Sequence, residues 1–147
     1  MSNAVHVPRL AIVLLATLVL AACSKGENHD SAHSGPSSSS AGLPTGHVAA
    51  GEQLAKAKGK ATGQSCIDCH GADGNAPIDP SYPKLGGQYA DYIEHSLVAY
   101  RSGDRGGSTT TDLMASQAKE LTDQQIADLA AYYGSVQGQL RDLHNAN

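Results

Sequence analysis

The stretch Cys66-Ile67-Asp68-Cys69-His70 decides how this sequence is interpreted. It places two thiols three positions apart and an imidazole directly after the second thiol. A thioredoxin-like redox pair would need a preceding strand and a βαβ context, and the surrounding sequence shows neither. A structural zinc site would need four ligands, and the 147 residues hold only 3 cysteines, with no second pair. A disulfide between the two thiols would close a very small, strained loop.

The same five residues form the attachment motif of a c-type haem. Cys66 and Cys69 add across the two vinyl groups as thioethers, and the two-residue gap matches the spacing of those vinyls. The imidazole of His70 then lies beneath the iron as the proximal ligand. It must be neutral at the coordinating nitrogen, while the other nitrogen donates a hydrogen bond that fixes the ring. The motif therefore predicts one covalently bound haem c.

A haem iron bound by one histidine leaves a second axial position to be filled. The chain has 2 methionines, and Met1 belongs to the predicted signal segment described below. Met114 follows His70 at a distance that lets the chain wrap around the haem. Most methionines fill gaps in a core, but the need for a sixth ligand favours Met114. The main rival is His95, which lies in a helical pattern with a half-exposed face.

The first 22 residues predict a bacterial signal segment. Residues 10–22 form an almost unbroken apolar run, which is shorter than the roughly 20 residues that cross a bilayer as a helix. The run ends in Leu-Ala-Ala-Cys at 20–23, which resembles the lipoprotein signal. That resemblance implies cleavage before Cys23 and lipidation of its thiol, which anchors stably once two or more acyl chains are attached. Ordinary cleavage near Ala22, leaving a free thiol, is the alternative.

Residues 23–46 predict a flexible tether after the signal. The segment is dominated by Ser, Gly, Pro and other polar residues and shows no hydrophobic period. As a random coil it would span roughly 25 to 30 Å. The folded domain is then expected over residues 47–147. The formal net charge is −4, and it becomes −5 when Arg9 leaves with the signal, which argues against a nucleic-acid partner.

The sequence of residues 47–147 predicts an all-α fold. Residues 47–58 are good helix formers, residues 89–101 place their large apolar side chains on one face, and Thr122 with Gln125 forms a capping box that begins a C-terminal helix. No stretch alternates like a strand. The chain has no Phe and no Trp, so its own core is thin, and a haem would supply the missing apolar body.

These residues together resemble a class I bacterial c-type cytochrome, especially the short single-haem periplasmic carriers. The resemblance extends over residues 51–136 and implies a cytochrome c fold of about four helices around the haem. Four segments carry it: CIDCHGADGNAP at 66–77, YPKLGGQYADYI at 82–93, AYRSGDR at 99–105, and MASQAKELTDQQIADLAAYY at 114–133.

The resemblance also implies roles for single residues. The carbonyl of Pro83 would accept the hydrogen bond from His70, and Leu85 would pack on the haem face. Arg101 and Arg105 match a segment that is often near the haem propionates, where a guanidinium could pair with a carboxylate. An exposed helix end and loop is the alternative for both arginines.

Two further features concern the helix packing and the methionine loop. Gly51 and the Tyr132-Tyr133 pair match the crossing of the terminal helices, where a glycine lets the backbones approach. The sequence GGSTTTD at 106–112 departs from many relatives. The resemblance therefore does not set the length or stiffness of the loop before Met114, nor the strength of the iron–sulfur bond that depends on them.

The function that follows is single-electron transfer by a carrier that is not an enzyme. No nucleophile motif, phosphate loop or paired carboxylates appear in the sequence. Expected partners are a quinol-oxidising complex or dehydrogenase as donor and a terminal oxidase or reductase as acceptor, on the periplasmic side of a bacterial membrane. A haem-based ligand sensor and a fixed cytochrome subunit of a larger redox enzyme are the alternatives.

Overall fold

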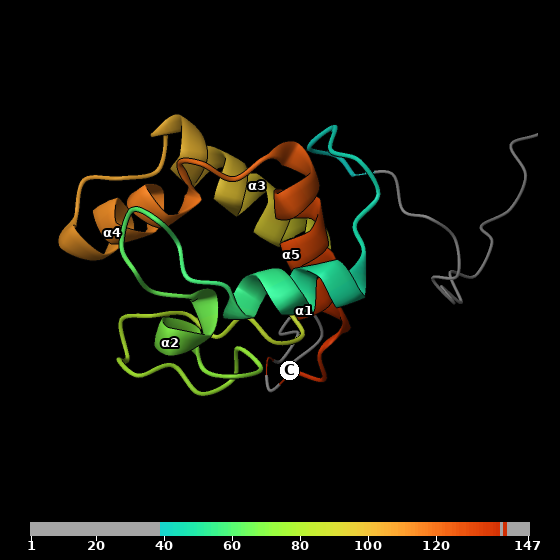
Figure 1. The fold of residues 1–147 in the computed structure, drawn as a ribbon, viewed down its shortest axis with the longest axis horizontal. Coiled ribbons are helices and arrows are strands. Elements are labelled where there is room, and N and C mark those ends of the chain that lie inside the picture. Colours follow the sequence, from blue (N-terminus) through green and yellow to red (C-terminus); the bar gives the residue numbers. More distant parts are fainter. Residues whose placement is uncertain (1–38, 139, 141–147) are drawn as a thin grey trace, which may run out of the picture. The chain divides into compact units, whose positions relative to one another are not determined.

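The computed structural model describes residues 39–138 and 140. This part of the chain contains five helices joined by loops, and no strand (Figure 1). This confirms the all-α prediction. None of the described helices is long and apolar enough to cross a membrane. The helices are α1 (Val48–Lys56), α2 (Cys66–His70), α3 (Ala90–Ser102), α4 (Thr109–Ala118) and α5 (Asp123–Ser135).

The start of α5 follows the predicted capping box. The Gln125 side chain accepts a hydrogen bond from the Thr122 backbone N–H at 2.9 Å, and the Thr122 hydroxyl accepts one from the Gln125 N–H at 3.2 Å. Asp123 lies in the first turn, where a negative charge is favourable. The helix then buries one apolar face, which includes Ile126 and Leu129.

The helix α4 begins earlier than the sequence indicated. Part of the stretch expected as a loop, from Thr109 onward, is helical in the structure. Ser108 caps this helix, because its hydroxyl accepts from the Thr111 N–H at 3.3 Å while its own N–H donates to the Thr111 hydroxyl at 2.9 Å. The hydroxyl pair satisfies backbone groups that a helix start otherwise leaves unpaired. Met114 therefore lies within a helix.

The terminal helices α1 and α5 cross at Gly51. A Cβ at this position would lie 1.9 Å from the Asp128 carbonyl oxygen and 2.7 Å from the Tyr132 Cβ. Only a glycine permits this approach of the two backbones, which confirms the predicted crossing. The neighbouring core is small and includes Ala55 and Leu129.

The segment before α1 contacts the domain from Ser39 onward. The Ser40 hydroxyl lies 2.6 Å from an Asp91 carboxylate oxygen and 2.7 Å from the His95 Nε2, and the Ser39 hydroxyl donates to Glu94. Residues 39–46, which the sequence assigned to the tether, thus lie against α3 and also contact α5, where the Gln124 side-chain amide donates to the Thr45 carbonyl at 2.9 Å. The predicted signal, Cys23 and the rest of the tether lie outside the described residues.

Candidate haem site

A cavity of about 370 Å³ lies between α2, the loop that follows it, α3, α4 and α5. Its walls are mostly apolar, and its size lies in the range of sites that bury a small organic molecule. The wall residues on which the site depends are Cys66, Cys69, His70, Leu85, Met114 and Tyr133. The structure therefore brings both motif cysteines, the motif histidine and the methionine to one cavity.

The attachment motif is itself the short helix α2, so that both cysteines and the histidine lie on one helical turn. The Asp68 side chain accepts a hydrogen bond from the Ser65 backbone N–H at 2.7 Å and another from the Lys58 ammonium. The bond from Lys58, followed by that from Ser65, lowers the pKa of Asp68 to about 2. These bonds fix the start of α2 and thereby the direction in which Cys66 enters the cavity.

The environment of Cys66 is poorly suited to a thiolate. Burial raises the pKa of its thiol to about 11, so that the free side chain is protonated at neutral pH and is a poor nucleophile or metal ligand. In residues 39–138 and 140 we find no group of three or more His, Cys, Asp or Glu side chains that could hold a metal ion. The position suits a thioether, which carries no charge.

His70 is buried, with 4% of its surface exposed. Its Nδ1 lies 2.9 Å from the carbonyl oxygen of Pro83. A carbonyl only accepts, so Nδ1 carries the proton and Nε2 keeps its lone pair for a metal. Burial lowers the pKa of His70 and outweighs the Pro83 hydrogen bond, which raises it. The contact predicted between His70 and Pro83 is present, and the lowered pKa favours the neutral imidazole that a metal would need.

The structure distinguishes between Met114 and His95, the two candidates for the second axial position. Met114 lines the cavity from α4, whereas His95 is exposed on α3 and bonds to Ser40 on the outer surface. His70 and Met114 thus line one cavity, and the rival histidine is not among its lining residues. Ligation of an iron by Met114 stays a prediction that this placement favours.

The two arginines that the sequence could not distinguish have different positions. Arg105 lines the cavity, donates to the Ser96 hydroxyl at 3.1 Å and stacks 4.8 Å from the Tyr100 ring centre. Arg101 is not among the wall residues. It donates to the Leu121 carbonyl at 2.9 Å and to Asp123 at 2.7 Å. The position of Arg105, not that of Arg101, suits a contact with a bound carboxylate.

Tyr133 reveals a functional feature that the sequence did not indicate. The side chain is 2% exposed and lines the cavity, yet its hydroxyl has no hydrogen-bond partner within the described residues. Burial raises its pKa, so it stays protonated and able to donate. An unpaired buried hydroxyl costs about 1–3 kcal/mol. An apolar body with a polar acceptor would satisfy both this hydroxyl and the walls, and a haem fits that description.

An all-α fold in which a Cys-x-x-Cys-His turn, a carbonyl-bound neutral histidine and a methionine share one apolar cavity defines a c-type cytochrome. The sequence profile of the cytochrome c family matches residues 48–137. The chain belongs to this family, and its cofactor is haem c.

Three relatives illustrate the similarity. Over 71 residues the chain is 49% identical to cytochrome c-554(548) of Halomonas halodenitrificans, covering 48% of this chain and 83% of the relative. Over 99 residues it is 38% identical to the thiosulfate dehydrogenase electron acceptor of Thiomonas intermedia, covering 66% and 45%. The crystal structure of reduced cytochrome c4 from Pseudomonas stutzeri superimposes with a TM-score of 0.54 and 28% identity, covering 64% of this chain and 53% of that one. The chain thus spans about half the length of the latter two.

Proposed function

We propose that this chain is a single-electron carrier whose one haem c is attached through Cys66 and Cys69 and ligated by His70 and Met114. The observation that carries this proposal is that the His70 and Met114 side chains line the same buried cavity. With both axial positions held by protein, no substrate reaches the iron. The remaining chemistry is outer-sphere electron transfer, and the chain is not an enzyme.

The surrounding side chains have supporting roles in this proposal. The Pro83 carbonyl accepts the hydrogen bond from the His70 Nδ1–H, Leu85 packs on the macrocycle, and Arg105 pairs with a propionate carboxylate. The haem supplies the one-electron iron couple when bound. The protein sets its potential through the axial pair and through burial, and His/Met ligation favours the reduced form.

We place the carrier on the periplasmic side of a bacterial membrane, anchored by lipid on Cys23. A flexible segment between Cys23 and the contacts that begin at Ser39 would let the domain meet protein partners. One relative is named as an electron acceptor of thiosulfate dehydrogenase, which supports a dehydrogenase as donor, and a quinol-oxidising complex is the other candidate. A terminal oxidase or reductase is then the acceptor, and no nucleic acid is involved.

The test is the visible spectrum of the purified protein, oxidised, reduced, and reduced under carbon monoxide. We expect a low-spin spectrum with the weak red methionine–iron band and no change with carbon monoxide. The Met114→Ala variant should lose the red band and bind carbon monoxide promptly. Prompt binding by the unsubstituted protein would favour the ligand sensor instead, and absence of covalent haem would refute the proposal. Co-purification with a larger enzyme after detergent extraction would favour the fixed-subunit alternative.

A further inference from the structure

We propose that Gln117 is a positioning residue that holds α4, the helix that carries Met114, against the loop between α1 and α2 that precedes the haem-attachment motif. The inference rests on the proposed ligation by Met114. In this account the Gln117 amide restricts the excursions of α4 and so limits how often the methionine leaves the iron.

The bridge consists of two hydrogen bonds from one side-chain amide. The Gln117 Nε2 donates to the Gln64 backbone carbonyl at 2.9 Å, and the Gln117 Oε1 accepts from the Thr62 hydroxyl at 2.6 Å. The Gln64 carbonyl can only accept, which fixes the orientation of the amide. Gln64 is followed directly by Ser65 and the motif residue Cys66. The amide therefore connects α4 to the segment that begins the attachment motif.

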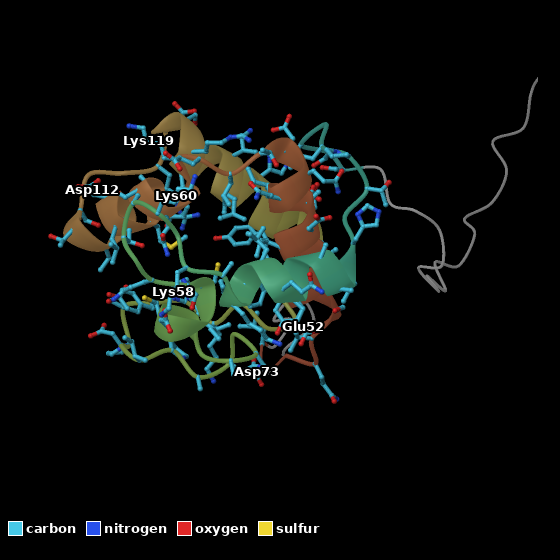
Figure 2. The ribbon with its side chains drawn as sticks, in the orientation of Figure 1. Glu52, Lys58, Lys60, Asp73, Asp112 and Lys119 are labelled. Carbon is cyan, nitrogen blue, oxygen red and sulfur yellow. The ribbon has the colours of Figure 1, made fainter. Side chains whose placement is uncertain are left out.

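The remaining support of α4 is one-sided. In the described part of the chain, α4 packs against α3 and against no other helix. It is joined to α3 by the exposed residues 103–108, in which Gly103 and Gly107 have positive φ angles. Figure 2 labels Lys60 on the loop between α1 and α2, and Thr62 and Gln64 of the same loop bond to Gln117 of α4. The Gln117 bonds to this loop therefore fix a side of α4 that no helix covers.

Gln117 and Met114 are mechanically linked because they lie three residues apart on one helix. Residues at this spacing share a helix face, and both side chains line the cavity. A displacement of α4 away from the loop would carry Met114 with it. The bridge is thus placed to act on the methionine and not merely on the stability of a distant surface.

Gly59, in the loop between α1 and α2, leaves room for the Gln117 side-chain amide because it has no Cβ. A Cβ at this position would lie 2.5 Å from the Gln117 Oε1. The Gly59 N–H also donates to the Gln64 carbonyl at 2.9 Å, so that this carbonyl accepts from both partners. Alanine at position 59 should push the amide away without altering α4 itself.

The experiment measures the apparent affinity of the ferric full-length holoprotein for imidazole, which binds only when the methionine is displaced. Loss of two hydrogen bonds predicts about a tenfold increase in affinity for Gln117→Leu. The red methionine–iron band should weaken in parallel. Gly59→Ala should shift the affinity in the same direction. The matched control is Ser116→Ala, because Ser116 is exposed on the same helix and its hydroxyl bonds only locally, to the Asp112 carbonyl.

The outcomes separate the two proposals. An imidazole affinity within twofold of the unsubstituted protein for both Gln117→Leu and Gly59→Ala would overturn the positioning role, even if thermal stability fell. An unsubstituted protein that lacks the red band would instead refute methionine ligation, before any Gln117 variant is examined. A tenfold effect in Gln117→Leu with none in Ser116→Ala supports the bridge.

Discussion

Substitution of Gly51 by alanine tests the helix crossing on which the fold depends. In an unobstructed helix this change would stabilise the protein by about 1 kcal/mol, because glycine is the poorer helix former. Here the added Cβ would lie 1.9 Å from the Asp128 carbonyl oxygen and 2.7 Å from the Tyr132 Cβ. Both obstacles lie on or next to the α5 backbone, so the two helices must separate.

The expected change in the free energy of unfolding follows from these two opposing effects. Overpacking of this kind costs up to about 3 kcal/mol, and the propensity gain offsets about 1 kcal/mol of that cost. We therefore expect Gly51→Ala to lose about 2 kcal/mol, which lowers Tm by roughly 10 °C in a domain of this size. Leu129 and Tyr133 line the haem cavity from α5, so the haem absorption spectrum should change as well.

The assay is thermal unfolding of the holoprotein followed by far-ultraviolet circular dichroism. Gly134→Ala is the matched control, because Gly134 also lies within a helix and its added Cβ would approach nothing closer than the Ala90 Cβ at 3.2 Å. That variant should unfold close to the unsubstituted protein. Equal melting temperatures for the two variants would show that the crossing is looser than described and that the reasoning is wrong.

Three other predictions concern the haem and the pH dependence. Tyr133→Phe should destabilise the holoprotein by about 1 kcal/mol and shift its reduction potential in a redox titration if the hydroxyl bonds to the haem; an unchanged potential would exclude that bond. Burial would raise the pKa of Asp128, but hydrogen bonds from Gln124 and His47 outweigh it and lower the pKa. The resulting stability is present above pH about 4 and is lost as the pH falls through the lowered pKa. In urea unfolding, Asp128→Asn should therefore have a lower free energy of unfolding than the unsubstituted protein at pH 7, and the difference should shrink as the pH falls below about 4. A variant with alanine at both motif cysteines should show no cooperative thermal unfolding, and a sharp transition would contradict this.

Local features of the site could be predicted from sequence because their physical causes are local. The spacing within Cys66–His70 follows from the chemistry of haem attachment, and the Thr122 capping box acts across a single turn. Crossing of the terminal helices was also predictable, because a glycine at position 51 matches a family pattern whose steric reason the structure shows.

Features that depend on the path of loops could not be predicted in this way. Arg101 and Arg105 lie four residues apart in one segment, and only the turn after α3 decides which of them lines the cavity. The Gln117 amide bonds to Gln64, which is 53 positions away in the chain. No periodicity or motif encodes such a pair, since it depends on where the loop between α1 and α2 meets helix α4.

The size of the cavity explains why the thin core and the cofactor belong together. An apolar cavity of about 370 Å³ that no side chain fills leaves its walls without packing partners, and such unfilled space destabilises a protein. The largest fully buried side chains of the described residues are Tyr133, Ile126 and Ser65, and none of them could rearrange to fill such a volume. Covalent attachment at α2 would therefore contribute to folding as well as to redox chemistry, because it would keep the apolar cofactor inside the cavity that α2, α3, α4 and α5 line.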